Sequence, residues 1–300
     1  ACAVRPKVEP GSTPPIKTYN KSEWQHFSLR EKIAQMIMVR IRGDYYHSEH
    51  WYRKSLKKWL MKDGIGGVIT FGGSIHGSYY NIQQFQKWAK YPLLVAADYE
   101  RGLGQWMSGA TLFPSNMAVA ATGNTDFAYQ QGQITALEAR ALGIHITFSP
   151  VMDINNNPDN PIINFRSYSD NPETVAKFGT AFIKGAQENG LITCAKHFPG
   201  HGGVAADSHI ALPVDERPLA ELKARDLVPF RELAGVLNGV MPAHVTYSAF
   251  DTRPAGFSPN WLGMLRESLG FKGCIFSDDL SMTGAHEAGG PAERAKAALA

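Results

Sequence analysis

The 300-residue sequence has little cysteine, no long apolar run and no concentration of charge of one sign. Its formal net charge is +3, and its lysines and arginines are scattered, so the basic stripe that nucleic-acid binding needs is missing. No apolar run is long enough to cross a bilayer, which predicts a protein without a membrane-spanning segment. No G-x-G-x-x-G opens a helix after the first apolar run, which argues against a dinucleotide site.

The cysteines are Cys2, Cys194 and Cys274. Cys194 and Cys274 lie inside apolar runs, which predicts two buried thiols rather than a disulfide or a zinc site. Cys2 precedes a polar stretch that contains prolines, so we expect residues 1–22 to form a flexible tail. Two interpretations of Cys2 stay open. It is either a lipid anchor, which would place a bacterial protein in the periplasm or at the cell surface, or part of a plain tail on a cytoplasmic protein.

Short apolar runs recur along the rest of the chain and alternate with stretches of helical periodicity. Continuous apolar character is typical of strands that are buried on both faces. Strands that alternate with helices predict a parallel sheet with right-handed crossovers. The expected strands lie at 33–39, 67–71, 92–97, 143–150, 191–198, 235–245 and 273–279.

Almost every apolar run ends in polar or ionisable residues, and this pattern favours a closed barrel over an open sheet. The strand ends of a (β/α)8 barrel converge on one mouth, where catalysis takes place. We therefore expect an α/β fold of the (β/α)8 TIM type, formed as a single catalytic domain by residues 23–300. Because seven runs precede the end of the chain at Ala300, the last strand or helix could be missing. The polar strand ends are Asp98, Glu100, Asp153, Lys196, His197, His244, Asp278 and Asp279.

The segment KHFPGHGGVAADSH, residues 196–209, has the highest density of candidate functional side chains, with a lysine, three histidines and an aspartate in a loop rich in glycine. Asp207 and His209 are two residues apart, so a local turn would join them by a hydrogen bond. An aspartate on one imidazole nitrogen raises the basicity of the other, which makes a proton shuttle. The alternatives are a solvated loop and a metal site built from His197, His201, Asp207 and His209.

The segment IFSDDLSM, residues 275–282, brings two adjacent acids to the end of the last predicted strand. Neighbouring strand residues point to opposite sides, so only one of the two acids can face the barrel interior. A carboxylate there can attack an anomeric carbon. Alternatively, Ser277, Asp278 or Asp279 caps the next helix, and both roles can coexist on the two acids.

K-H-F-P-G-H-G with D-S-H shortly after, followed by S-D-D-L-S-M, resembles glycoside hydrolase family 3 over about residues 28–284. More narrowly, these motifs are similar to bacterial β-N-acetylglucosaminidases of peptidoglycan turnover. The resemblance implies a TIM barrel that removes terminal β-linked N-acetylglucosamine through a covalent glycosyl-aspartate, with retention and without a metal or organic cofactor. It also implies a nucleophile at Asp278, an acid/base at His209 supported by Asp207, and sugar contacts from Asp98, Arg166, Lys196 and His197.

Several alternative interpretations stay open beside this family resemblance. Without the resemblance, Asp98 would be read as a strand-end cap and Arg166 as half of a surface ion pair. The family usually has an arginine near the position of Trp106, where a tryptophan offers a stacking face instead of a hydrogen-bonding fork. Other functions to be tested are a β-glucosidase or β-xylosidase of the same family, a metal-dependent hydrolase and a non-catalytic sugar-binding barrel.

Overall fold

The structure, a computed structural model, describes residues 24–299, and they form two compact units. The first unit runs up to Val95 and includes Ala141–Ile144, and the second contains Ala96–Arg140 and the residues from His145 onward. Cys2 and the tail expected at residues 1–22 lie outside the described residues. Across residues 24–299, no helix is both long and apolar enough to cross a membrane.

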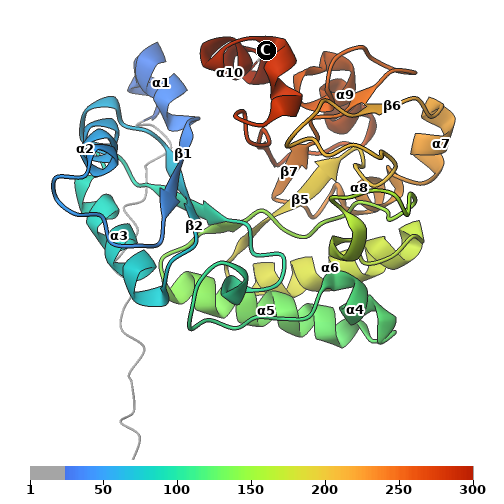
Figure 1. The fold of residues 1–300 in the computed structure, drawn as a ribbon, viewed down its shortest axis with the longest axis horizontal. Helices are drawn as coiled ribbons and strands as arrows, with labels where there is room; N and C mark the ends of the chain where they lie inside the picture. The colour runs from blue at the N-terminus through green and yellow to red at the C-terminus, as the bar shows by residue number, and fades with distance from the viewer. Residues whose placement is uncertain (1–23, 300) are drawn as a thin grey trace, which may run out of the picture. The chain divides into compact units, whose positions relative to one another are not determined.

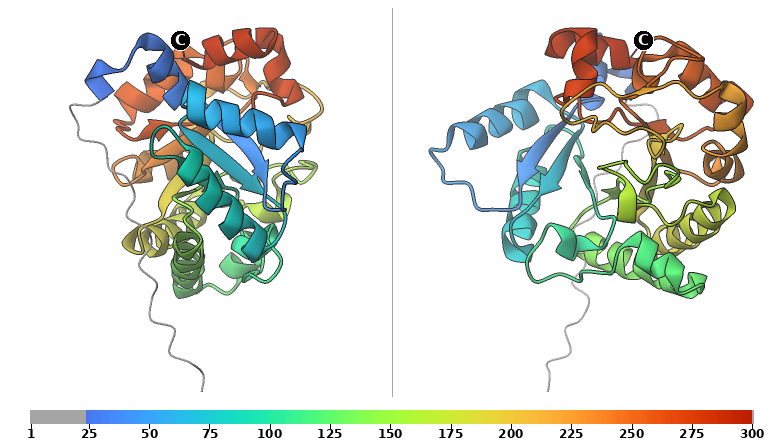
Figure 2. Two further views of the ribbon diagram at one scale, coloured as in Figure 1. Left: turned by 90° about the vertical axis from the view of Figure 1, so that its left-hand side faces the viewer. Right: turned by 45° about the vertical axis from the view of Figure 1, so that its right-hand side comes forward.

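The first unit is built on two parallel strands, paired from Met38 with Gly67 to Arg42 with Phe71. Figure 2 shows these strands side by side, with helices α2 and α3 along one face of the pair. The elements are η1 (Trp24–His26), α1 (Leu29–Gln35), β1 (Met38–Arg42), α2 (Trp51–Lys58), η2 (Trp59–Asp63), β2 (Gly67–Phe71) and α3 (Ile75–Trp88).

The strand expected at 33–39 is wrong in its bounds. Ser28 and Glu31 form a capping box, in which each side chain accepts a hydrogen bond from the backbone N–H of the other. Such a box satisfies N–H groups that a helix start leaves open, so it favours helix over the residues that follow. The helix α1 therefore includes Ile33, and the strand begins only at Met38.

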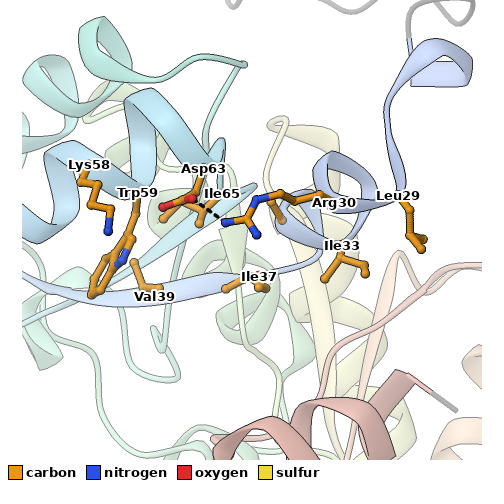
Figure 3. Close-up of a pocket in the computed structure, with 10 residues that line it drawn as sticks. Leu29, Arg30, Ile33, Ile37, Val39, Lys58, Trp59, Asp63 and Ile65 are labelled. Carbon is orange, nitrogen blue, oxygen red and sulfur yellow. Dashed lines mark hydrogen bonds and ion pairs between the residues drawn. The ribbon is translucent and has the colours of Figure 1, made fainter.

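An apolar groove lies in the first unit along α1 and β1 (Figure 3). The side chains of Leu29, Ile33 and Ile37 border it and are exposed. Arg30 and Asp63 also line it and form an ion pair of 2.9 Å (Figure 3). None of the residues that the sequence predicts for catalysis or sugar binding lines this groove.

The second unit has strands in the order β3-β4-β5-β7-β9, and the pairs whose register is resolved are parallel. Its remaining strands, β6 and β8, pair with each other in parallel, and the sequence did not predict them. The elements are β3 (Leu94–Ala97), which begins in the first unit, η3 (Leu103–Gln105), α4 (Asn116–Ala121), α5 (Thr125–Ala141), β4 (Ile146–Thr147), η4 (Asn164–Arg166), α6 (Pro172–Glu188), β5 (Ile192–Phe198), β6 (Val214–Asp215), α7 (Leu219–Ala224), α8 (Val228–Leu233), β7 (Gly239–Pro242), β8 (Thr246–Tyr247), η5 (Ala255–Phe257), α9 (Pro259–Gly263), η6 (Met264–Ser268), β9 (Cys274–Ile275), η7 (Thr283–Ala288) and α10 (Pro291–Leu299).

Helices α5 and α6 lie against each other beneath the strands of the second unit (Figure 1). A Cβ added to Gly132 would lie 2.2 Å from the carbonyl oxygen of Phe182, and one added to Gly185 would lie 2.1 Å from that of Tyr129. These glycines let the two helix backbones approach closely. The alternation of parallel strands and helices confirms the predicted α/β organisation, although most strands are shorter than the apolar runs that predicted them.

The two described cysteines are free thiols with different surroundings. Cys194 is buried in β5, as predicted, with strands on both sides. The prediction of burial is wrong for Cys274, which is exposed. Its strand β9 stands last in the strand order of the second unit, and among residues 24–299 no further strand pairs with its outer side.

The core of the second unit predicts one stability effect. Trp261 is fully buried, and its ring meets those of Phe198, Tyr247 and Phe250 at centroid distances of 6.0, 5.1 and 4.6 Å. We expect Trp261→Ala to lower the free energy of unfolding by about 3–5 kcal/mol, because it leaves a cavity among these rings. The half-exposed Trp24 is the control, and its replacement by alanine should cost less than about 1 kcal/mol. Denaturant unfolding with equal midpoints for both variants would contradict this assignment.

Candidate active site

The candidate site residues follow neighbouring parallel strands of the second unit. Carboxyl ends of parallel strands lie at the same edge of a sheet, so their side chains converge there. Lys196 and His197 lie in the last three residues of β5, and the other site residues follow their strands: Asp98 after β3, Asp153 after β4, His244 after β7 and Asp278 after β9. The sequence prediction that these strand ends carry polar groups agrees with this arrangement.

A buried ion cluster joins Asp98, Glu100, Arg166 and Lys196. The Nζ of Lys196 lies 2.6 Å from Oδ1 of Asp98 and 2.8 Å from Oε1 of Glu100. Arg166 meets the same Glu100 with two parallel bonds, Nε to Oε2 at 2.9 Å and Nη2 to Oε1 at 2.8 Å. Arg166 is therefore not half of a surface ion pair, since only 6% of the Glu100 side chain is exposed.

The electrostatics of this cluster keep all of its buried groups charged. Burial acts to raise the pKa of Glu100, but the charges of Lys196 and Arg166 outweigh it and hold that pKa well below its usual range. Burial likewise acts to lower the pKa of Lys196, and the carboxylates of Asp98 and Glu100 raise it instead. The side chains of Asp98 and Arg166 stay 23% and 22% exposed, so these two groups are the parts of the cluster that a ligand can reach.

Asp153 is a fully buried carboxylate that organises the start of the histidine-rich loop. Its Oδ2 lies 2.6 Å from Nδ1 of His197, and its Oδ1 accepts the backbone N–H of His201 at 2.6 Å. Burial acts to raise the pKa of Asp153, and the neighbouring His197 and His201 lower it. A carboxylate on Nδ1 of His197 leaves Nε2 of that ring as the atom for a ligand.

Asp207 and His209 form the hydrogen bond that the sequence predicted. Oδ1 of Asp207 lies 2.7 Å from Nδ1 of His209 and accepts the backbone N–H of the same residue at 2.8 Å. Burial acts to raise the pKa of Asp207, but the hydrogen bonds from His209 lower it. The His209 side chain is 54% exposed, so the imidazole is oriented by an ionised carboxylate while solvent and ligands can reach it.

The adjacent acids after β9 have different surroundings. Burial acts to raise the pKa of Asp278, but the nearby His197 and His244 and the backbone N–H of Asp279 hold it below its usual range. Asp279 instead holds a turn, because its Oδ1 accepts the backbone N–H of Ser281 at 2.8 Å. The alternative in which Ser277, Asp278 or Asp279 caps the next helix is wrong, since a turn follows them and the N-cap of the 3-10 helix η7 is Met282.

Sequence reasoning placed Glu100 and Asp153 among the polar strand ends at the barrel mouth, but it gave neither of them, nor Ser208, a specific role in the site. The spacing of Asp98 and Glu100, with the buried Tyr99 between them, was a signal that both acids act together. Asp153 left no such signal, because its partners lie 44 and 48 residues further along the chain. Ser208 stood inside a recognised motif, but its burial depends on a contact that only the folded loop makes.

Trp106 lies beside the ion cluster. Its indole Nε1 donates a hydrogen bond of 2.9 Å to the carbonyl oxygen of Asp98, and 41% of the residue is exposed. The indole is thus attached to the backbone of a residue expected to bind sugar. Its effect on ligand preference stays a prediction.

The three histidines of the loop have different partners. His197 contacts Asp153, His201 contacts Ser208 and His209 contacts Asp207. Over residues 24–299, no three histidine, cysteine, aspartate or glutamate side chains gather as a metal site would require. The metal-site interpretation of the loop therefore has no geometric support in this part of the chain.

The ion cluster gives a prediction about stability and pH. Glu100→Gln should lower the free energy of unfolding by about 3–5 kcal/mol at neutral pH, because Lys196 and Arg166 lose their shared counter-charge. The lowered pKa of Glu100 stabilises the fold above the unfolded-state pKa of about 4.3, and this contribution is lost as pH falls. The difference from wild type should therefore shrink below about pH 4.

Chemical denaturation across a pH series measures this effect. The exposed Glu287 is the matched control, and Glu287→Gln should change the free energy of unfolding by less than about 0.5 kcal/mol. A Glu100→Gln deficit that stays constant from neutral to acidic pH would exclude the charge interaction as its cause.

Comparison with known proteins identifies similar chains. The family described as glycosyl hydrolase family 3 N terminal domain matches residues 28–300. A β-hexosaminidase of Tolumonas auensis is 44% identical over 249 residues, which cover 80% of this chain and 74% of that protein. A β-hexosaminidase of Neisseria meningitidis serogroup C is 42% identical over 257 residues, covering 80% of this chain and 70% of that protein.

Two solved structures are similar to the fold. A glycoside hydrolase family 3 β-N-acetylglucosaminidase from Paenibacillus sp. has a TM-score of 0.84 and 35% identity, covering 91% of this chain and 53% of that chain. NagZ from Neisseria gonorrhoeae, in complex with N-trifluoroacetyl-D-glucosamine, has a TM-score of 0.76 and 36% identity. The match covers 88% of this chain and 78% of the NagZ chain.

Proposed function

The chain belongs to glycosyl hydrolase family 3, and from this premise we propose that it is a retaining, exo-acting β-N-acetylglucosaminidase. The resemblance noted in the sequence is confirmed, the protein is a glycoside hydrolase, and its α/β fold is of the TIM-barrel type that was expected. The specificity, the covalent route and the residue roles below are the proposal. The relatives named above are bacterial, whereas a lipid anchor at Cys2 stays a prediction.

The observation that carries the proposal is the 2.7 Å contact between Asp207 and His209 on a partly exposed loop. At the start of the same loop, His197 helps to hold the pKa of Asp278 below its usual range, although burial acts to raise it. Two further facts support N-acetylglucosamine as the sugar. The relatives are named β-hexosaminidases, and one similar structure binds N-trifluoroacetyl-D-glucosamine. We propose terminal β-linked N-acetylglucosamine of peptidoglycan-derived or related glycans as the substrate.

The first step forms a glycosyl-enzyme intermediate. The carboxylate of Asp278 attacks the anomeric carbon, and the bond from that carbon to the leaving oxygen breaks. The proton on Nε2 of His209 moves to this oxygen, so the leaving group departs as a neutral alcohol. Asp207 accepts the Nδ1–H of the ring throughout and fixes its orientation.

The second step reverses the roles and restores the enzyme. The neutral imidazole of His209 takes a proton from water, whose oxygen then bonds to the anomeric carbon as the bond to Asp278 breaks. Two inversions at one carbon give net retention of configuration. One imidazole thus acts first as acid and then as base.

Sugar hydroxyl groups are held by the residues at the ends of β3 and β5. Asp98 offers a partly exposed carboxylate, while the Nζ of Lys196 and the ring of His197 are fixed by Glu100 and Asp153. Arg166 uses three of its N–H groups on Glu100 and on the carbonyl of Ile162. A guanidinium has five such groups, so donors remain for a ligand.

Mutation of the two catalytic candidates tests their roles. Asp278→Ala should abolish hydrolysis of aryl β-N-acetylglucosaminides, since no nucleophile remains. His209→Ala should lose about 10²–10⁴-fold in rate on substrates with poor leaving groups and much less on activated ones, because only poor leaving groups need the proton. Steady-state kinetics on a leaving-group series measures both effects. Wild-type activity in Asp278→Ala would remove this residue from the nucleophile role.

Comparison of substrates separates the alternatives. Aryl β-N-acetylglucosaminide should be hydrolysed in preference to aryl β-glucoside and β-xyloside, and NMR of the first-formed product should show the β-anomer. Activity should survive a chelator, because a metal-dependent hydrolase would lose its metal. The α-anomer as first product would exclude the covalent route, and binding without turnover would favour a sugar-binding barrel.

A further inference from the structure

Ser208 differs from its two catalytic neighbours in the loop. Asp207 and His209 are partly or largely exposed, whereas only 2% of Ser208 is accessible. Its Oγ lies 3.0 Å from Nε2 of His201, and its carbonyl oxygen accepts the backbone N–H of Gly284 at 3.0 Å. The middle residue of the D-S-H segment is therefore held by two hydrogen bonds, one through its side chain and one through its backbone.

His201 is a rigid partner for this contact. The residue is 2% exposed, and its backbone N–H donates to Asp153 at 2.6 Å while its carbonyl accepts Nδ2 of Asn160 at 2.8 Å. Burial, together with the nearby His197, lowers the pKa of the His201 ring to about 4, so the ring is neutral at neutral pH. Its Nδ1 has no partner in the described part of the chain, so a proton on Nε2, pointing at Ser208, avoids a buried unsatisfied N–H.

The backbone hydrogen bond from Gly284 to Ser208 connects the loop to the segment that follows the proposed nucleophile. Gly284 stands six residues after Asp278. A Cβ at this position would lie 2.9 Å from the Cβ of His244 and 3.2 Å from the carbonyl oxygen of Ser208. Only a glycine allows this close approach without displacement of its neighbours.

We propose that His201 is a positioning residue, and that its bond to Ser208 holds the D-S-H turn where the His209 ring reaches the leaving oxygen. This inference rests on the proposed function, because it assigns His209 as the acid. His201 itself contacts neither substrate nor reacting atoms. It continues the line of contacts from Asp153, so one buried carboxylate orients both the sugar-binding His197 and, through His201, the loop with the acid.

The effect of breaking this bond is distinct from the loss of the acid. The contact between Asp207 and His209 is local, two residues apart, so we expect it to survive when Ser208 changes. The imidazole would keep its hydrogen bond to Asp207 but lose its fixed place. The rate of the first step should therefore fall most for poor leaving groups, while KM and the pH dependence of kcat stay close to wild type.

The test uses Ser208→Ala, His201→Gln and Ser208→Thr on an aryl β-N-acetylglucosaminide series. Ser208→Ala should lower kcat on the poorest leaving group by about 10–100-fold, the loss typical of a misplaced catalytic group, with a smaller loss on the best. Ser208→Thr keeps the hydroxyl and should recover most of the rate. His201→Gln keeps a donor near the same place and should retain more activity than Ser208→Ala.

Controls separate the bond from general loosening of the loop. Val204→Ala removes buried apolar contact from the same loop, and Ile210→Ala changes an exposed side chain beside His209. Neither variant should change how kcat depends on the leaving group. Circular dichroism and thermal unfolding identify variants that fail to fold. If the His201 variants do not fold, the test relies on Ser208→Ala, which is the mildest change.

A double-mutant cycle completes the test. His201→Ala with Ser208→Ala should be no worse than the poorer single variant, because both remove one interaction. Additive losses, or an equal loss on all leaving groups, would overturn the assignment of His201 while leaving the proposed function intact. If wild type cleaves no aryl β-N-acetylglucosaminide, the proposed function itself fails.

Discussion

The buried carboxylate of Asp153 is the constraint on which the site depends. A carboxylate with no exposed surface is costly unless donors surround it, and here the donors are the ring and backbone of His197 and the backbone of His201. Satisfying this one group fixes the end of β5 and the first turn of the histidine-rich loop. The requirement to pair a buried charge thus sets the geometry of residues that face the ligand.

The proposed sugar-binding groups of the site are mostly buried and held in place, whereas the proposed acid is accessible. The two carboxylates of Asp98 and Glu100 balance the two cations of Lys196 and Arg166 inside the second unit, so the sugar-binding groups are placed before a ligand arrives. The proposed acid instead stands on a loop, with its imidazole largely in contact with solvent. Such a loop can admit a sugar and release a product, and it relies on Asp207 and Ser208 for orientation.

Sequence patterns predicted the parallel organisation of the main strands and one local contact, but they predicted the strand bounds and the long-range contacts poorly. The hydrogen bond between Asp207 and His209 followed from a spacing of two residues, and the parallel strands followed from apolar runs. The pairing of Arg166 with Glu100 joins residues 66 positions apart, which no local pattern encodes. The exposure of Cys274 depended on which strand stands last in the order, and this is likewise a tertiary property.

An imidazole acid has a physical advantage beside a carboxylate nucleophile. Two close carboxylates repel each other when ionised, so one of them has a raised pKa and the pair titrates as a coupled unit. Here Asp278 lies among His197, His244 and a backbone N–H, which lower its pKa and keep it ready to attack. Imidazoles in general titrate near neutral pH, so such a group can donate a proton in one step and accept one in the next. The mechanism then requires that the ring be placed accurately, and a buried serine held by a neutral histidine can supply that placement without adding a charge.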